Sequence, residues 1–297
     1  MSAAFDPTAP LTASGNLRRR RVVNLLAESI ATGAALVAVV VLGVVIVSVA
    51  VRGAPALSLD FLTKAPPQFG GPGGGIGPAI LGTAVIVLAT TLMSVPLGVL
   101  LAIYVSELAG PRTVAVVRLA LDLLNGLPSI VIGLFAFSLL VVGRHQSGFA
   151  GAVALAVIMV PLIARAAQEI LLLVPHQLRE AADALGVSRW RTIVGVVLPS
   201  ALGGIVTGTV LAIARAAGET APLMFTTSIF NNHASFDLFG QALPNIPVMI
   251  FILSEQPDPA GYQRAWGAGL VLLVFILVAN AVARTLAARS RAKLGAR

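Results

Sequence analysis

The 297-residue sequence has no cysteine, and only 11% of its residues are charged and 5% aromatic. Without cysteine there is no disulfide framework, no thiolate metal site and no cysteine nucleophile. Soluble domains carry about 25% charged residues and about 45–50% apolar ones. Here 57% of the residues are hydrophobic, more than one compact water-soluble core can hide. The composition therefore predicts an integral membrane protein and argues against a cytosolic enzyme or a nucleic-acid-binding module.

Long apolar runs predict an all-α bundle of about six transmembrane helices. A spanning helix needs about 20 mostly apolar residues. The runs that qualify lie near residues 30–51, 77–105, 123–142, 148–164, 200–223 and 266–286. A shorter apolar run, 246–253, is too short to span and is predicted to be a re-entrant or interfacial segment.

The distribution of lysine and arginine predicts that both termini lie in the cytoplasm. With the N-terminus inside, about fifteen of these residues fall inside and about four outside. The four arginines at 18–21 then anchor the first span at the anionic inner surface, and no nucleic-acid partner is expected. The predicted divisions are a cytoplasmic N-terminal tail (1–27), a first helix with an outer Gly/Pro-rich loop (28–76), a membrane core (77–290) and a cytoplasmic C-terminal tail (291–297).

The inner loop 165–199 is the longest and the richest in charge. Its alanines and leucines favour a helix, with Glu180 and Asp183 expected in the first turns, where the helix dipole favours negative charge. Gly186 is expected to end that helix, because glycine enters the left-handed cap conformation cheaply. A short amphipathic helix of this kind either docks into a groove on a cytoplasmic partner or lies on the membrane surface, and the sequence leaves both open.

Two ionisable residues fall inside the fifth apolar run. Arg215 and Glu219 are four residues apart, so on a helix they share one face and can pair. They either lock the helix structurally, or Arg215 offers its planar fork of donors to an oxyanion while Glu219 orients it. Pro222 is expected to end or kink the helix. Thr207 and Leu211 are expected to continue the face that carries Arg215 and Glu219. Gly204 and Gly208 are expected to let a neighbouring helix pack closely.

The loop also carries a recognisable pattern over residues 180–199. It reads Glu-Ala-Ala, three residues, Gly, nine residues, then Val-Val-Leu-Pro. This resembles the EAA loop of ABC-importer permeases, at 178–199 in this chain. The resemblance implies a MetI-like bundle whose loop forms a coupling helix seated on an ATPase subunit. The residues that it implies for coupling are Arg179, Glu180, Ala181, Ala182, Asp183 and Gly186.

Three more stretches, 125–135, 215–225 and 265–270, resemble the PstA-type branch of phosphate permeases. That resemblance implies an ATP-driven importer of inorganic phosphate in the bacterial inner membrane. Its other subunits would be a PstC-type permease, two copies of a PstB-type ATPase and a PstS-type phosphate-binding protein. The implied path residues are Arg215, Glu219, Thr220, Asn125 and Ser129; the last two have the alternative role of bending the helix beside Pro128.

Other classes of function are less well supported by the residues. No Gly-Lys-Ser/Thr loop is present, so we expect no ATP hydrolysis by this chain itself, no enzymatic activity and no cofactor. A permease for another oxyanion, sulfate or molybdate, is the nearest alternative. An intramembrane protease would need a Ser–His pair, two aspartates or a zinc site in the spans, and a stand-alone secondary transporter would leave the docking loop unexplained. The nearly uncharged outer loop 231–263 is the expected contact surface for a binding protein.

Overall fold

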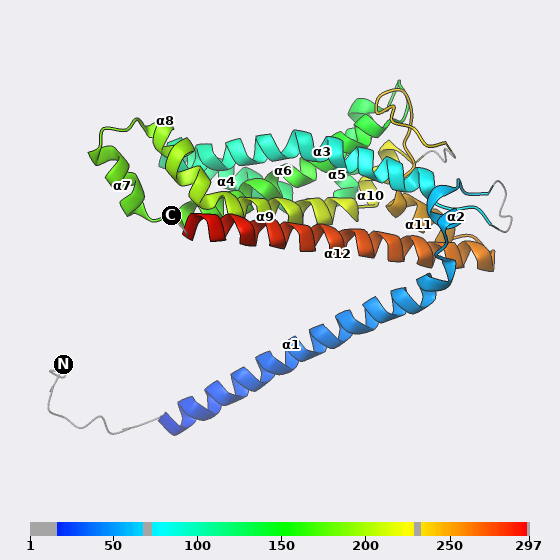
Figure 1. The fold of residues 1–297 in the computed structure, drawn as a ribbon, viewed down its shortest axis with the longest axis horizontal. Helices are drawn as coiled ribbons and strands as arrows, with labels where there is room; N and C mark the ends of the chain where they lie inside the picture. The colour runs from blue at the N-terminus through cyan, green and yellow to red at the C-terminus, as the bar shows by residue number, and fades with distance from the viewer. Residues whose placement is uncertain (1–16, 68–72, 229–232, 296–297) are drawn as a thin grey trace. The chain divides into compact units, whose positions relative to one another are not determined.

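A computed structural model describes residues 17–67, 73–228 and 233–295, and all regular structure in these ranges is helical (Figure 1). The chain divides into two compact units, residues 1–51 and 52–297, which are considered separately. Helix α1, Leu17–Gly53, makes up the described part of the first unit. Residues 1–16 of the predicted N-terminal tail lie outside the described residues, and 17–27 belong to α1.

The remaining helices follow in order along the chain. Two π-helical turns, η3 and η4, continue α3 and lead into α9. The elements are η1 (a 3-10 turn, Ala54–Ala56), α2 (Leu59–Thr63), α3 (Gly77–Ile103), η3 (Tyr104–Leu108), α4 (Pro111–Gly126), α5 (Ser129–Leu140), α6 (Gly148–Leu172), α7 (His176–Ala184), α8 (Arg189–Thr192), η4 (Ile193–Val197), α9 (Leu198–Ala217), α10 (Ala221–Thr226), α11 (Ile246–Ser254) and α12 (Pro259–Gly295).

The predicted spans are confirmed, with two changes of form: the helix of the run near 200–223 ends at Ala217, and the run near 123–142 is bent. Five helical segments of the described chain are long and apolar enough to cross a membrane: 19–56, 77–108, 148–172, 189–217 and 259–282. The third predicted run, near 123–142, is not one straight helix. It is the pair α4 and α5, bent by 98° at Leu127 and Pro128. Proline disfavours the helical conformation for the residue before it, so the chain turns there and a new helix begins at Ser129.

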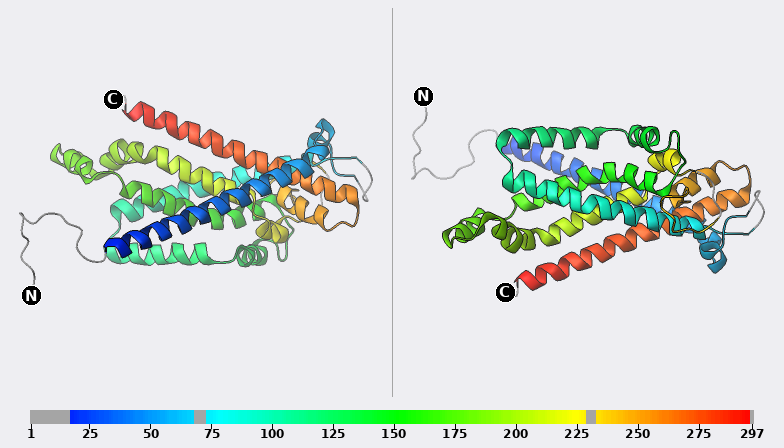
Figure 2. Two further views of the ribbon diagram at one scale, coloured as in Figure 1. Left: turned by 90° about the horizontal axis from the view of Figure 1, so that it is seen from below. Right: turned by 90° about the horizontal axis from the view of Figure 1, so that it is seen from above.

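In the second unit, α3, α6, α9 and α12 run side by side (Figure 2). Helix α6 is central, and its buried face is made mostly of small side chains, including Ala152, Ala156 and Ala167. Small residues let helix backbones approach closely, which is how helices associate where lipid supplies no hydrophobic driving force. Helices α7 and α8 lie at one end of this bundle, and α2 and α11 at the other (Figure 1).

Helix α11 is short, as the sequence predicts for this apolar run. The side chain of Asn245 caps it by accepting from the backbone N–H of Val248 at 3.0 Å. Its first amide, that of Ile246, donates to the hydroxyl of Thr83 on α3 at 2.9 Å. Ile246, Met249 and Leu253 are buried against α3 and α12. These contacts fix the short helix to the bundle end, and its re-entrant placement in a membrane stays a prediction.

The loop between α6 and α9 is shorter than predicted. Helix α6 continues to Leu172, so Arg165 lies within a helix rather than in the loop. Its guanidinium Nε donates to the carboxylate of Asp122 on α4 at 3.0 Å, and this ion pair between the two helices is partly exposed. The expectation that the loop begins at 165 is therefore wrong.

Candidate functional site

Two groups of predicted site residues lie far apart in the second unit. The first is on α7 and α8, at the end of the bundle. Helix α7 begins at His176, directly after Pro175, so Glu180 and Asp183 lie in its second half. The expected placement of these two acids in the first turns is wrong, because the helix starts earlier than the alanine-rich stretch suggests.

Gly186 ends α7 as predicted. Its φ is +72°, in the left-handed region that glycine adopts without strain. The Gly186 N–H donates to the carbonyl of Asp183 at 2.9 Å, and the Val187 N–H donates to that of Ala182 at 3.0 Å. These two bonds form a Schellman motif, which satisfies the last carbonyls of the helix and turns the chain toward α8.

The coupling residues implied by the resemblance divide between an exposed and a buried face. Glu180, Ala181 and Asp183 are exposed, whereas Ala182 is buried against the rest of the loop. Next to the exposed acids, Leu185 is 83% exposed and Trp190 60% exposed. Apolar side chains flanked by charges on a protruding helix are typical of a surface that another protein covers.

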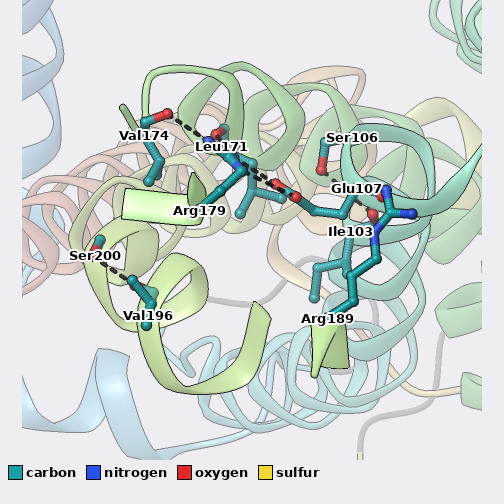
Figure 3. A network of polar contacts seen from close by, with 9 residues as sticks. All are labelled: Ile103, Ser106, Glu107, Leu171, Val174, Arg179, Arg189, Val196 and Ser200. Carbon is teal, nitrogen blue, oxygen red and sulfur yellow. Dashed lines mark hydrogen bonds and ion pairs between the residues drawn. The ribbon is translucent and has the colours of Figure 1, made fainter. Parts of the chain in front are cut away.

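Arg179 points inward and holds α7 to the bundle (Figure 3). Its guanidinium binds both carboxylate oxygens of Glu107, with Nη2–Oε1 at 2.6 Å and Nε–Oε2 at 3.2 Å. It also donates to the carbonyls of Val174 at 2.7 Å and Leu171 at 3.1 Å, where α6 ends. Arg189 on α8 donates to the backbone carbonyl of Glu107. Glu107 was missed by the sequence analysis; its only signal is an acid standing directly after an apolar run.

A cluster of buried hydrophobic side chains lies next to this polar network. It joins the end of α3, the end of α6, η4 and the start of α9 through nine buried side chains: Ala102, Ile103, Ala167, Leu171, Val174, Ile193, Val197, Ala201 and Ile205. A cavity of about 340 Å³ lies beside the network, between η3 and α7. The loop is thus seated on three helices rather than attached only through the chain.

The second group of site residues lies where α9 gives way to α10. Helix α9 ends at Ala217, and Gly218, Glu219 and Thr220 form the break before α10 begins at Ala221. Pro222 occupies the first turn of α10, where its missing N–H costs no hydrogen bond. The predicted kink therefore comes before Pro222, and Glu219 lies in the break rather than on the helix that carries Arg215.

Arg215 and Glu219 pair across this break. The Arg215 Nε lies 3.6 Å from the Glu219 Oε1. The Arg215 side chain is 59% exposed, while that of Glu219 is 17% exposed. The structure brings the two charges together as the sequence predicts. At 3.6 Å this contact is longer than a hydrogen bond, and a guanidinium carries five N–H donors.

A groove between α6 and α9 reaches Leu211, one turn before Arg215 on α9. Its volume is about 470 Å³, and Thr207, Gly208 and Leu211 line it from α9. Gly204 and Gly208 allow the close approach that the sequence predicts: a β-carbon on either would lie 2.6 Å from Ile170 or Ala166 of α6. At one end of the groove are Glu169 of α6 and Ser200 of α9.

Helices α5 and α10, which follow the α4–α5 break and the α9–α10 break, pack against each other. A β-carbon on Gly133 of α5 would lie 2.6 Å from the Cα of Pro222, and the rings of Phe137 and Phe225 are 6.4 Å apart. The two helices therefore run parallel, and Ser129, one turn before Gly133, starts α5 near the level of Glu219. Ser129 is half-buried and Asn125 exposed on opposite sides of the α4–α5 break.

The known proteins that this chain matches are inner membrane components of transport systems. The family model for the binding-protein-dependent transport system inner membrane component matches residues 94–292. The phosphate transport system permease protein PstA of Xylella fastidiosa (strain 9a5c) is 39% identical over 94% of this chain and 98% of its own length. PstA of Yersinia pestis is 39% identical over 83% of this chain and 84% of its own length. PstA 1 of Mycobacterium tuberculosis (strain H37Rv) is 41% identical over 76% of this chain and 74% of its own length.

Solved structures share the fold at low sequence identity. A chain of a bacterial alginate ABC transporter, in complex with its alginate-bound periplasmic protein, has a TM-score of 0.63 at 16% identity, covering 92% of this chain and 99% of that one. A chain of the inward-facing MetNI methionine ABC transporter has a TM-score of 0.56 at 19% identity, covering 73% and 94%. The helical arrangement is thus that of ABC-transporter permeases, as the sequence predicts.

Proposed function

The chain belongs to the family of binding-protein-dependent transport system inner membrane components, and from that premise we propose that it imports inorganic phosphate as one pore subunit of an ATP-driven complex. The curated relatives named as phosphate permeases support this substrate. ATP hydrolysis belongs to a partner subunit, so this chain is the conduit rather than the enzyme.

The observation that carries the proposal is the exposed Arg215 within a membrane-spanning segment. A charged side chain facing lipid costs about 2.5–3.5 kcal/mol at the centre of a spanning helix on the lowest experimental scale. Arg215 lies in the last turn of α9, where the chain continues into the break before α10. Arg215 is 59% exposed in the isolated chain, so lipid is the least favourable medium for that face. Water in a conduit, or a second permease across it, removes this cost. The face formed by Thr207, Leu211 and Arg215 is accordingly the wall of the path.

The chemistry of this face suits a tetrahedral oxyanion. A guanidinium binds phosphate oxygens with two parallel donors, which a lysine cannot do. Glu219 takes one edge of the guanidinium and orients the other toward the path. Thr220 in the same break, and Ser129 and Asn125 at the neighbouring break, add uncharged polar groups near the same level. A single cation, partly balanced by Glu219 and flanked by uncharged polar groups, holds the anion briefly and then releases it.

Other subunits take the surfaces that remain uncovered. The exposed face of α7, with Glu180, Ala181 and Asp183, is the seat of an ATPase dimer in the cytoplasm. A homologous permease closes the path opposite Arg215. The loops at the α11 end, of which 229–232 lie outside the described residues, face a phosphate-binding protein. With this orientation both termini are cytoplasmic, and the complex lies in the bacterial inner membrane.

Reconstitution tests the proposed function. The tagged chain is purified with the subunits that accompany it, placed in liposomes containing ATP, and supplied with labelled phosphate and its binding protein. ATP-dependent uptake that unlabelled phosphate competes with, and excess sulfate or molybdate does not, is the expected result. Competition by sulfate or molybdate would assign another oxyanion. Uptake without any ATPase subunit would contradict the proposal in favour of a secondary transporter.

A further inference from the structure

Glu107 is a buried acid that none of the transport roles above uses. It lies on η3, the π-helical turn that ends α3, and its side chain is 7% exposed. A carboxylate taken out of water is stable only with a well-oriented partner and further hydrogen bonds. The partners of Glu107 both come from the loop: the side chain binds Arg179 of α7, and the backbone carbonyl accepts from Arg189 of α8.

We propose that Glu107 is a positioning residue that passes movement of the α7–α8 loop to α3. This inference rests on the proposed function, in which nucleotide-driven movement of an ATPase is applied to the exposed face of α7. Movement reaches α9 directly, because α8 and η4 continue into it along the chain. No such covalent continuity joins the loop to α3, because Glu107 and Arg179 are separated by 72 residues.

The geometry of the ion pair suits a rigid connection. Both oxygens of Glu107 are engaged by Arg179, and a two-point contact fixes direction as well as distance. Arg179 also donates to the carbonyls of Leu171 and Val174 at the end of α6. One guanidinium therefore ties α7 to both α3 and α6. Arg189 adds a second connection to the same residue from the other helix of the loop.

The test compares uptake with ATP hydrolysis in one preparation of the reconstituted complex. Glu107→Gln keeps the shape of the side chain but removes its charge. We expect the phosphate imported per ATP hydrolysed to fall about tenfold, the effect of losing one charge-assisted hydrogen bond. Arg179→Lys keeps the charge but loses the two-point contact of the guanidinium, and should lower the phosphate imported per ATP hydrolysed by a smaller factor. The matched control is Asp60→Asn, which removes an acid from an exposed pair with Lys64 and should change the ratio less than about twofold.

A second measurement does not depend on the transported substrate. Because the chain has no cysteine, Leu100→Cys on α3 and Ser188→Cys, between α7 and α8, provide its only thiols for spin labels. Both side chains are exposed, and Ser188 is not among the residues assigned to the ATPase seat. We expect one narrow distance between the labels that nucleotide leaves unchanged, because α3 moves with the loop. With Glu107→Gln added, nucleotide should broaden or shift that distance.

The outcomes separate this inference from the proposed function. Wild-type complex that does not import phosphate would contradict the proposed function, while the label distances would still test Glu107. An unchanged ratio and an unchanged distance in Glu107→Gln would overturn the positioning role. A parallel fall of ATP hydrolysis and uptake would also overturn it, since that result means a lost ATPase seat rather than a lost connection to α3.

Discussion

Replacing Gly186 tests whether the end of α7 is what presents the loop to a partner. The φ of Gly186 is +72°, and a β-carbon there would meet no atom within 4 Å. The cost of Gly186→Ala is therefore purely conformational, about 1–2 kcal/mol for an L-residue in the left-handed region. In a complex-free chain whose α7–α8 loop is only marginally ordered, that cost lowers the fraction of molecules with a correctly capped α7 by up to about 5–30-fold.

The assay is the ATPase subunit retained per permease during purification, together with phosphate uptake. Gly195→Ala is the matched control, because Gly195 follows α8 in the same region, a β-carbon added there would meet no atom within 4 Å, and its φ is not positive. Gly186→Asn should fall between them, since asparagine tolerates the left-handed conformation better than alanine. If Gly186→Ala retains as much ATPase as Gly195→Ala and transports equally, the role of the cap is refuted.

Two further substitutions test the packing that positions the path. Gly133→Ala would place a β-carbon 2.6 Å from the α10 backbone, so the two breaks must separate, at a cost of about 1–3 kcal/mol. Uptake should fall in intact complexes, whereas Gly126→Ala, with open space around it, should leave uptake unchanged. Thr83→Val should lower the thermal unfolding midpoint in detergent, because the buried first amide of α11 loses its acceptor, worth about 1–3 kcal/mol. Thr91→Val, whose hydroxyl donates to its own helix, should lower it much less; equal shifts would contradict this assignment.

Local chemistry made much of the fold predictable. Apolar runs of sufficient length located every span, since a helix satisfies its own backbone in lipid over such lengths. The end of α7 at Gly186 and the close approach at Gly204 and Gly208 followed from the absence of a side chain. The pairing of Arg215 with Glu219 followed from their spacing, although a helix break lies between them.

Features that depend on distant residues were not predictable in this way. The bond between Glu107 and Arg179 joins positions 72 residues apart, and nothing in either local sequence indicates the other. The contact of Arg165 on α6 with Asp122 on α4 likewise joins positions 43 residues apart. The 98° bend at Leu127 and Pro128 has a local cause, but its angle does not follow from the sequence around it. Tertiary contacts decided these features rather than local propensity.

The central claim is that the Arg215 side chain lines the path of the anion, and ATP-driven phosphate uptake by Arg215→Ala tests it most directly. Each charge-assisted hydrogen bond to the anion is worth about 1.5–3 kcal/mol, so uptake should fall at least about tenfold. Arg215→Ala leaves the Glu219 carboxylate, whose side chain is 17% exposed, without its partner, so retention of the other subunits is measured alongside uptake. Lys64→Ala, which removes a cation from an exposed pair of the same spacing, should leave uptake unchanged. Normal uptake by assembled Arg215→Ala complexes would contradict the account.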